Sequence, residues 1–181
     1  MGVLYDYFAA PSDGEAASVI DRSGGPGSHT ATAGAPPRPK RGIFGRKPVP
    51  RQAGVEPDPD PVAIRTVSVR GIDPVVQLGT LEELLTGRPY HEVVEDPLSG
   101  HEVAIRDGGA RLVVTLTDTV TAALAAASPP DLDRVAVPWS QTEEFGSAAD
   151  PVALARFLAE LADLAREAVG DGHRLYCWVC V

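Results

Sequence analysis

The sequence contains few residues of several kinds, and each shortage excludes a class of protein. Only two of its 181 residues are cysteine, too few for the disulfide framework of a small secreted domain. No apolar run approaches the roughly 20 residues that a membrane-spanning helix needs, so we expect no membrane span. The N-terminus carries Asp6 and Asp13 where an export signal would be basic and then apolar. We therefore expect a cytoplasmic protein.

The motifs of common enzyme classes are also missing, including the phosphate-binding loop, G-x-G-x-x-G and G-x-S-x-G. A zinc-protease helix would need a second histidine four residues after His91, where Glu95 stands; a surface loop and a carboxylate-rich metal site remain the two alternatives at 91–96. Cys177 and Cys180 have C-x-x-C spacing, but residues three apart on a strand point to opposite faces. We predict two structural cysteines, no metal, no cofactor and no catalytic set.

Acidic side chains outnumber basic ones, and the two kinds are unevenly distributed. The whole chain has 25 acidic and 16 basic residues, a net charge of −9. Six of the basic residues but only three of the acidic ones fall between residues 23 and 61, which leaves the rest of the chain at −12. A body of this charge repels phosphates, so we expect the folded domain to bind no nucleic acid. The charge fits a basic protein partner or simply solubility.

Residues 23–61 interrupt the domain, because no hydrophobic period survives there. Proline and glycine are dense, and the only apolar pair is Ile43-Phe44. Such a segment cannot bury enough surface to offset its ordering entropy, so we predict a disordered or surface linker between residues 1–22 and 62–181. Its basic stretch, 38–51, is either solvated or makes weak contacts with an anionic partner.

The stretch from Asp150 to Val181 predicts two buried elements in succession. Asp150-Pro151 is typical of a helix start, because the Asp side chain can accept from free N–H groups. Apolar residues then recur at three- and four-residue spacing, and Gly170-Asp171-Gly172 ends the predicted helix over 150–169. Residues 175–181 are apolar on both faces, which predicts a strand covered on both sides.

Similar patterns predict the other elements. Strands are expected at residues 3–8, 64–69, 103–106, 111–116 and 135–137. Helices are expected after Ser12 and at residues 73–86, 90–94 and 117–127, and capping-box spacing occurs at Ser12–Glu15, Thr80–Glu83 and Ser140–Glu143. The two strands around Asp107-Gly108-Gly109 form a predicted hairpin. The expected fold is a single α+β domain with a mixed or antiparallel sheet of four to six strands, on which the long C-terminal helix packs.

Four stretches, taken together, carry a family resemblance. They are Met1-Gly2 before an aromatic strand, Gly71-Ile72-Asp73 leading to Leu84-Leu85-Thr86-Gly87, Asp96-Pro97-Leu98-Ser99, and the closing helix followed by Gly172 and an apolar strand. In order and spacing they resemble the YfbM-like family of uncharacterised bacterial proteins over residues 1–22 and 62–181. Val75 and Val76 stand where that family usually has aromatic residues. The resemblance implies a small cytoplasmic α+β domain and supplies no activity.

One group of residues is the first candidate for a pocket. Trp139 offers an aromatic platform, Ser140 a hydroxyl, and Glu143 and Glu144 two carboxylates, which could act as acid and base if held about 5–10 Å apart. Adjacent helical residues diverge, however, and Ser140 with Glu143 is also explained as a helix cap. The candidate site comprises Tyr5, Tyr7, Trp139, Ser140, Glu143 and Glu144.

We favour a non-enzymatic interaction domain that binds a protein partner through its acidic surface, and charge complementarity favours a basic partner. Neutralising a basic toxin or nuclease, an immunity-like role, is one specific form. The alternative is a small-molecule-binding protein or enzyme with a pocket near Trp139–Glu144. A third possibility is attachment to nucleic acid or membrane through residues 38–51.

Overall fold

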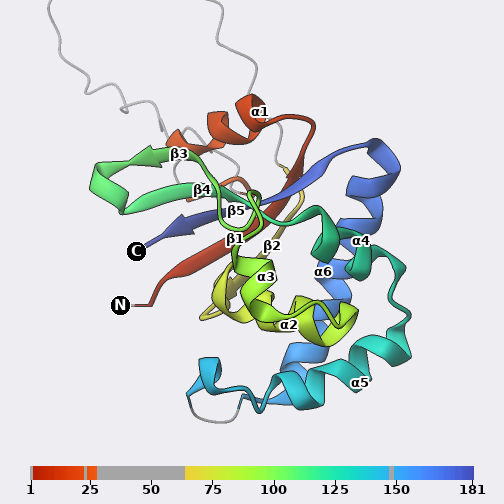
Figure 1. The fold of residues 1–181 in the computed structure, drawn as a ribbon. Coiled ribbons are helices and arrows are strands. Elements are labelled where there is room, and N and C mark those ends of the chain that lie inside the picture. Colours follow the sequence, from red (N-terminus) through yellow and green to blue (C-terminus); the bar gives the residue numbers. More distant parts are fainter. Residues whose placement is uncertain (1, 23, 28–63, 147–148) are drawn as a thin grey trace, which may run out of the picture.

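The computed structural model describes residues 2–22, 24–27, 64–146 and 149–181, and it confirms the predicted α+β fold (Figure 1). The strands are β1 (Leu4–Ala10), β2 (Thr66–Arg70), β3 (Glu102–Arg106), β4 (Arg111–Thr115) and β5 (Arg174–Cys180). The helices are α1 (Asp13–Ser18), α2 (Val76–Thr86), α3 (Tyr90–Val94), α4 (Asp118–Ala126), α5 (Pro129–Trp139) and α6 (Pro151–Asp171). Three short 3-10 turns are η1 (Val19–Asp21), η2 (Asp107–Gly109) and η3 (Glu143–Phe145).

The last strand, β5, lies at the centre of the sheet, whose order is β2-β1-β5-β4-β3. Every neighbouring pair is antiparallel, and β1 runs along the whole of β5, from Leu4 opposite Cys180 to Ala10 opposite Arg174. Residues 175–179 are all buried. The prediction of a buried C-terminal strand is therefore confirmed.

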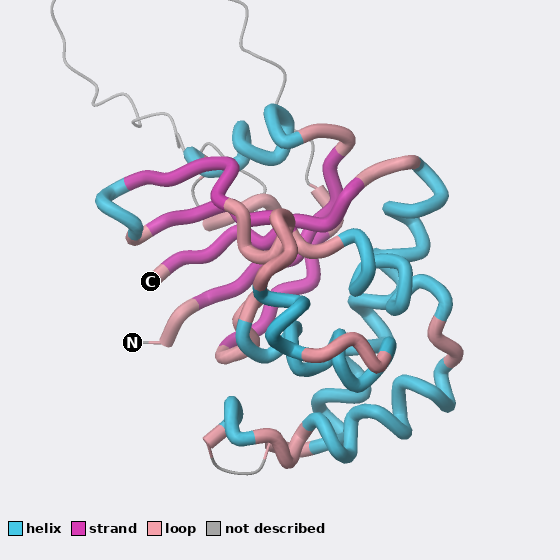
Figure 2. Tube along the Cα trace, viewed as in Figure 1, coloured by secondary structure: helices cyan, strands magenta, loops and turns pink. Residues whose placement is uncertain are grey.

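Alternate strand residues point to the two faces of the sheet, and one face is covered by more helices than the other. On the major face, Tyr7, Val114 and Cys177 join one large core with side chains from α2, α4, α5 and α6. On the minor face, Phe8 and Trp178 join a smaller core, which α1 and η1 cover. Figure 2 shows most of the helices grouped beside the major face. The two cysteines are free and point to opposite faces, as their spacing predicted.

Three predicted helix starts are confirmed by their side-chain caps. Ser12 accepts from the backbone N–H of Glu15 at 3.3 Å before α1, and Thr117 accepts from that of Val120 at 3.1 Å before α4. Asp150 accepts from Val152 at 3.0 Å before α6. That helix passes through Gly170 and ends at Gly172, whose φ of 68° is the left-handed conformation that glycine adopts readily.

The predicted strand at residues 135–137 is wrong, because these residues lie inside α5. Ser128 precedes this helix, and its backbone N–H donates to the Asp131 carboxylate at 3.2 Å. Two prolines in the first helical turn need no hydrogen-bond donor there, so Ser128-Pro129-Pro130 starts a helix as well as ending one. An apolar run of three residues is too short for its period to distinguish a strand from a helix.

Two of the three predicted capping boxes are also wrong. Thr80 lies inside α2, where its hydroxyl donates to the Gln77 carbonyl at 2.8 Å. Ser140 follows the end of α5, and its hydroxyl donates to the Val137 carbonyl at 2.7 Å. A Ser or Thr hydroxyl can donate to a carbonyl of the preceding helical turn or accept from an N–H at the start of a following helix. The spacing of a capping box does not distinguish these two cases.

The domain continues beyond residue 22, the first boundary predicted for the linker. Gly25 and Pro26 are buried, and the backbone N–H of Ile64 donates to the Pro26 carbonyl at 3.4 Å. We call residues 24–27 the glycine turn. Of the predicted linker 23–61, only this turn is described; the basic stretch 38–51 lies outside the described residues.

Candidate functional site

Two of the candidate residues, Tyr5 and Tyr7, bond to the segment before α2. The Tyr7 hydroxyl donates to the Ile72 carbonyl at 2.7 Å, and the Tyr5 hydroxyl donates to Oδ2 of Asp73 at 3.3 Å. Burial, followed by the neighbouring Asp73 carboxylate, raises the pKa of Tyr5 to about 12; burial also raises the pKa of Tyr7 well above its usual value. Both hydroxyls therefore stay protonated at neutral pH and act as fixed donors rather than bases.

The Asp73 carboxylate, in turn, organises the start of α2. Its Oδ1 accepts from the backbone N–H groups of Val75 at 2.8 Å and Val76 at 3.0 Å. The sequence pair Asp73-Pro74 thus supplies the predicted helix start, although regular helix begins only at Val76.

Trp139 lies on the other side of the same segment and is fully buried. Its Nε1 donates to the Gln77 carbonyl at 2.9 Å, and its ring contacts those of Phe145 and Phe157 at centroid distances of 5.2 and 6.4 Å. Gln77 also donates through Nε2 to the Glu144 carbonyl at 2.8 Å. Trp139 therefore packs in the interior and presents no exposed ring face.

The structure brings four of the six candidate residues around residues 72–77, and their contacts there are internal hydrogen bonds. Ser140 is buried against α5, and Glu143 is exposed on η3. A pocket of about 240 Å³ lies beside this cluster, with Arg70, Ile72, Phe145 and Asp150 in its wall. None of the six candidate residues lines that pocket. A ligand site formed by the six candidate residues stays a prediction.

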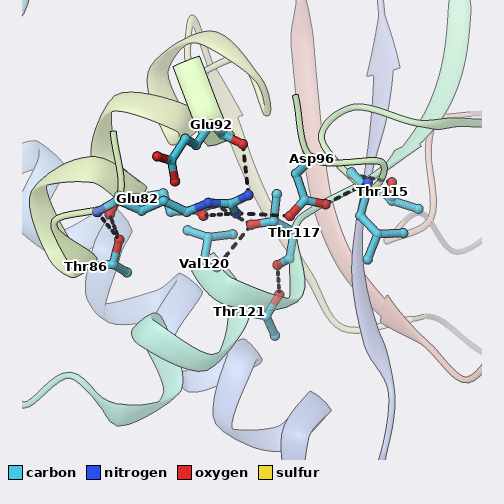
Figure 3. A network of polar contacts seen from close by, with 10 residues as sticks. Glu82, Thr86, Glu92, Asp96, Thr115, Thr117, Val120 and Thr121 are labelled. Carbon is cyan, nitrogen blue, oxygen red and sulfur yellow. Dashed lines mark hydrogen bonds and ion pairs between the residues drawn. The ribbon is translucent and has the colours of Figure 1, made fainter. Parts of the chain in front are cut away.

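A buried carboxylate that the sequence did not single out lies at the centre of a network of polar contacts (Figure 3). Glu82 of α2 is 1% exposed, and its Oε1 accepts from Nη1 of Arg88 at 3.1 Å. Its Oε2 accepts from the Thr117 hydroxyl. The same Arg88 donates to Oδ2 of Asp96 at 3.0 Å and to the Glu92 carbonyl at 2.8 Å.

This Glu82 network joins elements that are distant in the sequence. Thr117 caps α4, and Oδ1 of Asp96 accepts from the Leu98 backbone N–H at 2.9 Å. The Thr115 hydroxyl of β4 donates to the Leu98 carbonyl at 2.6 Å. The network therefore ties α2, α3, the following loop and α4 together. Both Glu82 oxygens are hydrogen-bonded, so the geometry indicates a structural role.

A groove of about 500 Å³ lies between α2, α4 and α5, and we call it the α2–α5 groove. Its wall is mainly apolar and includes Leu84, Leu85, Ala123, Ala126, Val135 and Pro138. Leu84 is 41% exposed, and an ion pair between Asp131 and Arg134 lies in the polar part of the wall. Its wall contains none of the candidate residues. The groove is formed by the packing of three helices, which the sequence patterns did not predict.

Within the described ranges, no group of three or more His, Cys, Asp or Glu side chains is arranged to hold a metal ion. No helix in that part of the chain is long and apolar enough to cross a membrane. Comparisons of the sequence and structure with protein-family models, curated proteins and solved structures give no match. The resemblance to the YfbM-like family therefore stays a prediction, and the α2–α5 groove is the strongest feature on which to base a function.

Proposed function

We propose that the domain binds a protein partner by accommodating an amphipathic helix with basic flanks in the α2–α5 groove. The carrying observation is a concave apolar surface on a strongly acidic body. Groove-binding helices place apolar residues at successive turns into such surfaces and keep their polar face in solvent. A basic toxin or nuclease, the partner of an immunity-like protein, is one class that fits.

Exposed aliphatic side chains lie in the wall of the groove and beside it. Leu84 of α2 is 41% exposed and Val137 of α5, next to the groove residue Pro138, is 48% exposed. Covering apolar surface contributes about 25 cal/mol for each Å² removed from water. A partner's aliphatic residues would therefore bind favourably here, whereas a small polar substrate would leave the wall exposed.

The charge of the domain favours a partner with basic residues beside its apolar face. Outside residues 23–61 the chain has 22 acidic and ten basic residues. Glu83 on α2 and Asp133 on α5 are exposed and adjoin groove residues in the sequence, and the groove residue Arg134 is paired with Asp131. Basic flanks on the partner would be attracted to carboxylates that have no ion-pair partner among the described residues, which raises the association rate. Added salt screens this attraction and should lower the rate.

The alternative of a small-molecule site at Trp139–Glu144 has less support. Trp139 and Tyr7 are fully buried, and each donates its polar hydrogen to a backbone carbonyl. A ligand there would have to break those bonds, whereas the α2–α5 groove is already open.

The test uses the full-length chain and a synthetic helix of about 18 residues with leucine on one face and lysine on the other. We expect binding by calorimetry, and Leu84→Lys should weaken it roughly tenfold, which is about 1.4 kcal/mol. Chemical-shift changes should centre on Ala123, Ala126 and Val135. Replacing the peptide's leucines with serine should abolish binding, and replacing its lysines with glutamate should weaken it.

The matched control is Ile105→Lys, which adds the same charge at an aliphatic residue of β3 that is 49% exposed and lies outside the groove. This variant should bind the peptide as the unmodified protein does. Equal weakening by both substitutions, or retained binding of the serine peptide, would show that charge alone drives association and would contradict the groove proposal.

A further inference from the structure

The minor face of the sheet holds a buried acid that the groove does not use. Asp6 of β1 is 3% exposed, and the strand register places it between Ser68 of β2 and Trp178 of β5. Among the described residues, Oδ1 of Asp6 and Nε1 of Trp178 are buried without a hydrogen-bond partner. Buried polar atoms of this kind are rare in folded proteins, and an adjacent acceptor and donor call for a physical explanation.

The glycine turn, residues 24–27, lies directly over this pair. A Cβ atom added to Gly25 would be 2.3 Å from Oδ2 of Asp6 and 3.3 Å from the Trp178 ring, and Gly25 has a φ of +88°. A Cβ on Gly27 would lie 2.9 Å from the Thr66 hydroxyl. The turn therefore touches the carboxyl group with no room for a side chain, and Gly25 satisfies both the conformation and the close approach.

The same turn is bonded to the chain on both sides of it in the sequence. The Ile64 backbone N–H and the Arg22 guanidinium both donate to the Pro26 carbonyl, at 3.4 and 3.5 Å. Ile64 lies two residues before β2. Pro26 therefore connects the described residues that flank positions 28–63.

The surroundings of Asp6 favour its neutral form. Burial raises the pKa of its carboxyl group, and the Ser68 hydroxyl lowers it by a smaller amount. The ion pairs of the described residues do not include Asp6. The charged or titratable side chains on the elements around this face are Asp13, Glu15, Asp21, Arg22, Arg70, Arg106, Arg111, Arg174, Tyr176 and Cys180. Of these, Asp21 pairs with Arg106, Arg111 pairs with Asp107, and Tyr176 donates to Asp13.

We propose that Asp6 and Trp178 form a proton-controlled latch for the glycine turn. With Asp6 neutral, the turn stays closed over the carboxyl group. When Asp6 releases its proton to solvent, the buried carboxylate requires hydration, and the turn lifts so that water reaches Oδ1 and the Trp178 indole. The bond from Ile64 to Pro26 opens with it. Lower pH therefore closes the latch and higher pH opens it, independently of the α2–α5 groove.

The chain contains an internal control for this proposal, because its other tryptophan, Trp139, has a bonded indole on the major face. The measurement is the hydrogen-exchange rate of the two indole N–H groups in the full-length protein, by NMR over a pH series. Base catalysis affects both indoles alike, so the ratio of the Trp178 rate to the Trp139 rate isolates the latch. We expect this ratio to rise at least several-fold with pH, together with exchange of the Ile64 amide.

Three variants sharpen the result. Asp6→Asn should keep the ratio constant across the pH series, and Gly25→Ala should raise it at every pH because the turn cannot close. Glu160→Gln, which removes an exposed acid of α6, should leave the pH dependence unchanged. A rate ratio that does not change with pH in the unmodified protein, or that changes identically in Asp6→Asn, would contradict the latch proposal.

A second readout avoids dependence on any variant folding well. Carbon-13 NMR follows the Asp6 carboxyl directly in the unmodified protein. Its titration midpoint should lie above the ordinary range of aspartate and coincide with the midpoint of the indole-rate ratio. Two midpoints that differ by more than about one pH unit, which corresponds to about 1.4 kcal/mol, would contradict the proposal.

Discussion

Glu82 on the major-face side and Asp6 on the minor face are both almost fully buried carboxylates, yet their oxygens have different partners. Both oxygens of Glu82 are bonded, one to Arg88 and one to Thr117. One oxygen of Asp6 has no partner among the described residues. A buried charge is stable when it is paired and costly when it is not, so the same residue class is structural in one place and sensitive to pH in the other.

The two faces also differ in the thickness of their cover. Four helices, α2, α4, α5 and α6, pack on the major face, whereas α1, η1 and the glycine turn cover the minor face. Regions with few packed neighbours open at lower free-energy cost than a thick core. The major face therefore supplies a rigid wall for the α2–α5 groove, and the minor face supplies the part that moves.

The largest expected effect compares the central tryptophan of each face. Trp139→Ala should destabilise the protein by about 3–5 kcal/mol, because it removes a buried ring and the indole hydrogen bond to the Gln77 carbonyl, which then keeps the Thr80 hydroxyl as a side-chain donor. Trp178→Ala should destabilise the protein by about 3 kcal/mol, because the indole N–H has no hydrogen-bond partner among the described residues and no bond is lost. Urea denaturation of both variants measures the difference. A larger loss for Trp178→Ala would reverse the ranking of the two faces.

At neutral pH, replacing the two buried acids should change the free energy of unfolding in opposite directions. Glu82→Ala should destabilise by about 3 kcal/mol, since Thr117 and Arg88 both lose a partner, although Arg88 is 26% exposed and can be rehydrated. Asp6→Asn should stabilise by about 1 kcal/mol, because it removes an unpaired buried charge with little change in shape. Denaturation midpoints at pH 7 provide the measurement, and a destabilised Asp6→Asn would contradict the account of the minor face.

The smallest effect is expected on the groove surface. Leu84→Lys should change the free energy of unfolding by less than about 0.5 kcal/mol, because the side chain is already partly exposed. Its effect on peptide binding should then reflect the groove and not the fold. Thermal unfolding checks this, and a loss of more than about 1 kcal/mol would mean that Leu84 belongs to the core.

Much of the fold was predictable because its signals are local. The caps at Ser12, Thr117 and Asp150 and the two-sided apolar pattern of residues 175–181 each follow from neighbours in the sequence. The strand expected at 135–137 failed because a short apolar run fits a strand and a helix equally well, and only the packing of α5 on α6 decides.

The environments of single side chains were less predictable. Glu82 looks like any exposed helical acid, since Arg88 and Thr117 reach it only through the tertiary fold. Asp6 lies in an alternating strand, and its burial depends on the glycine turn. The candidate residues Tyr5 and Trp139 do gather at one place, but the sequence could not show that their polar groups point inward to Asp73 and Gln77.

The most direct test of the difference between the two faces is the free energy of unfolding of the unmodified protein and Asp6→Asn across a pH series. Burial raises the pKa of folded Asp6 above its unfolded value, so its neutral form contributes stability that is present below about pH 4 and lost as the pH rises through the folded-state pKa. Other acids contribute equally to both proteins and cancel in the difference. The account predicts that Asp6→Asn gains stability relative to the unmodified protein as the pH increases. Parallel curves would show that Asp6 is not an unpaired acid in the folded protein, and would contradict the account.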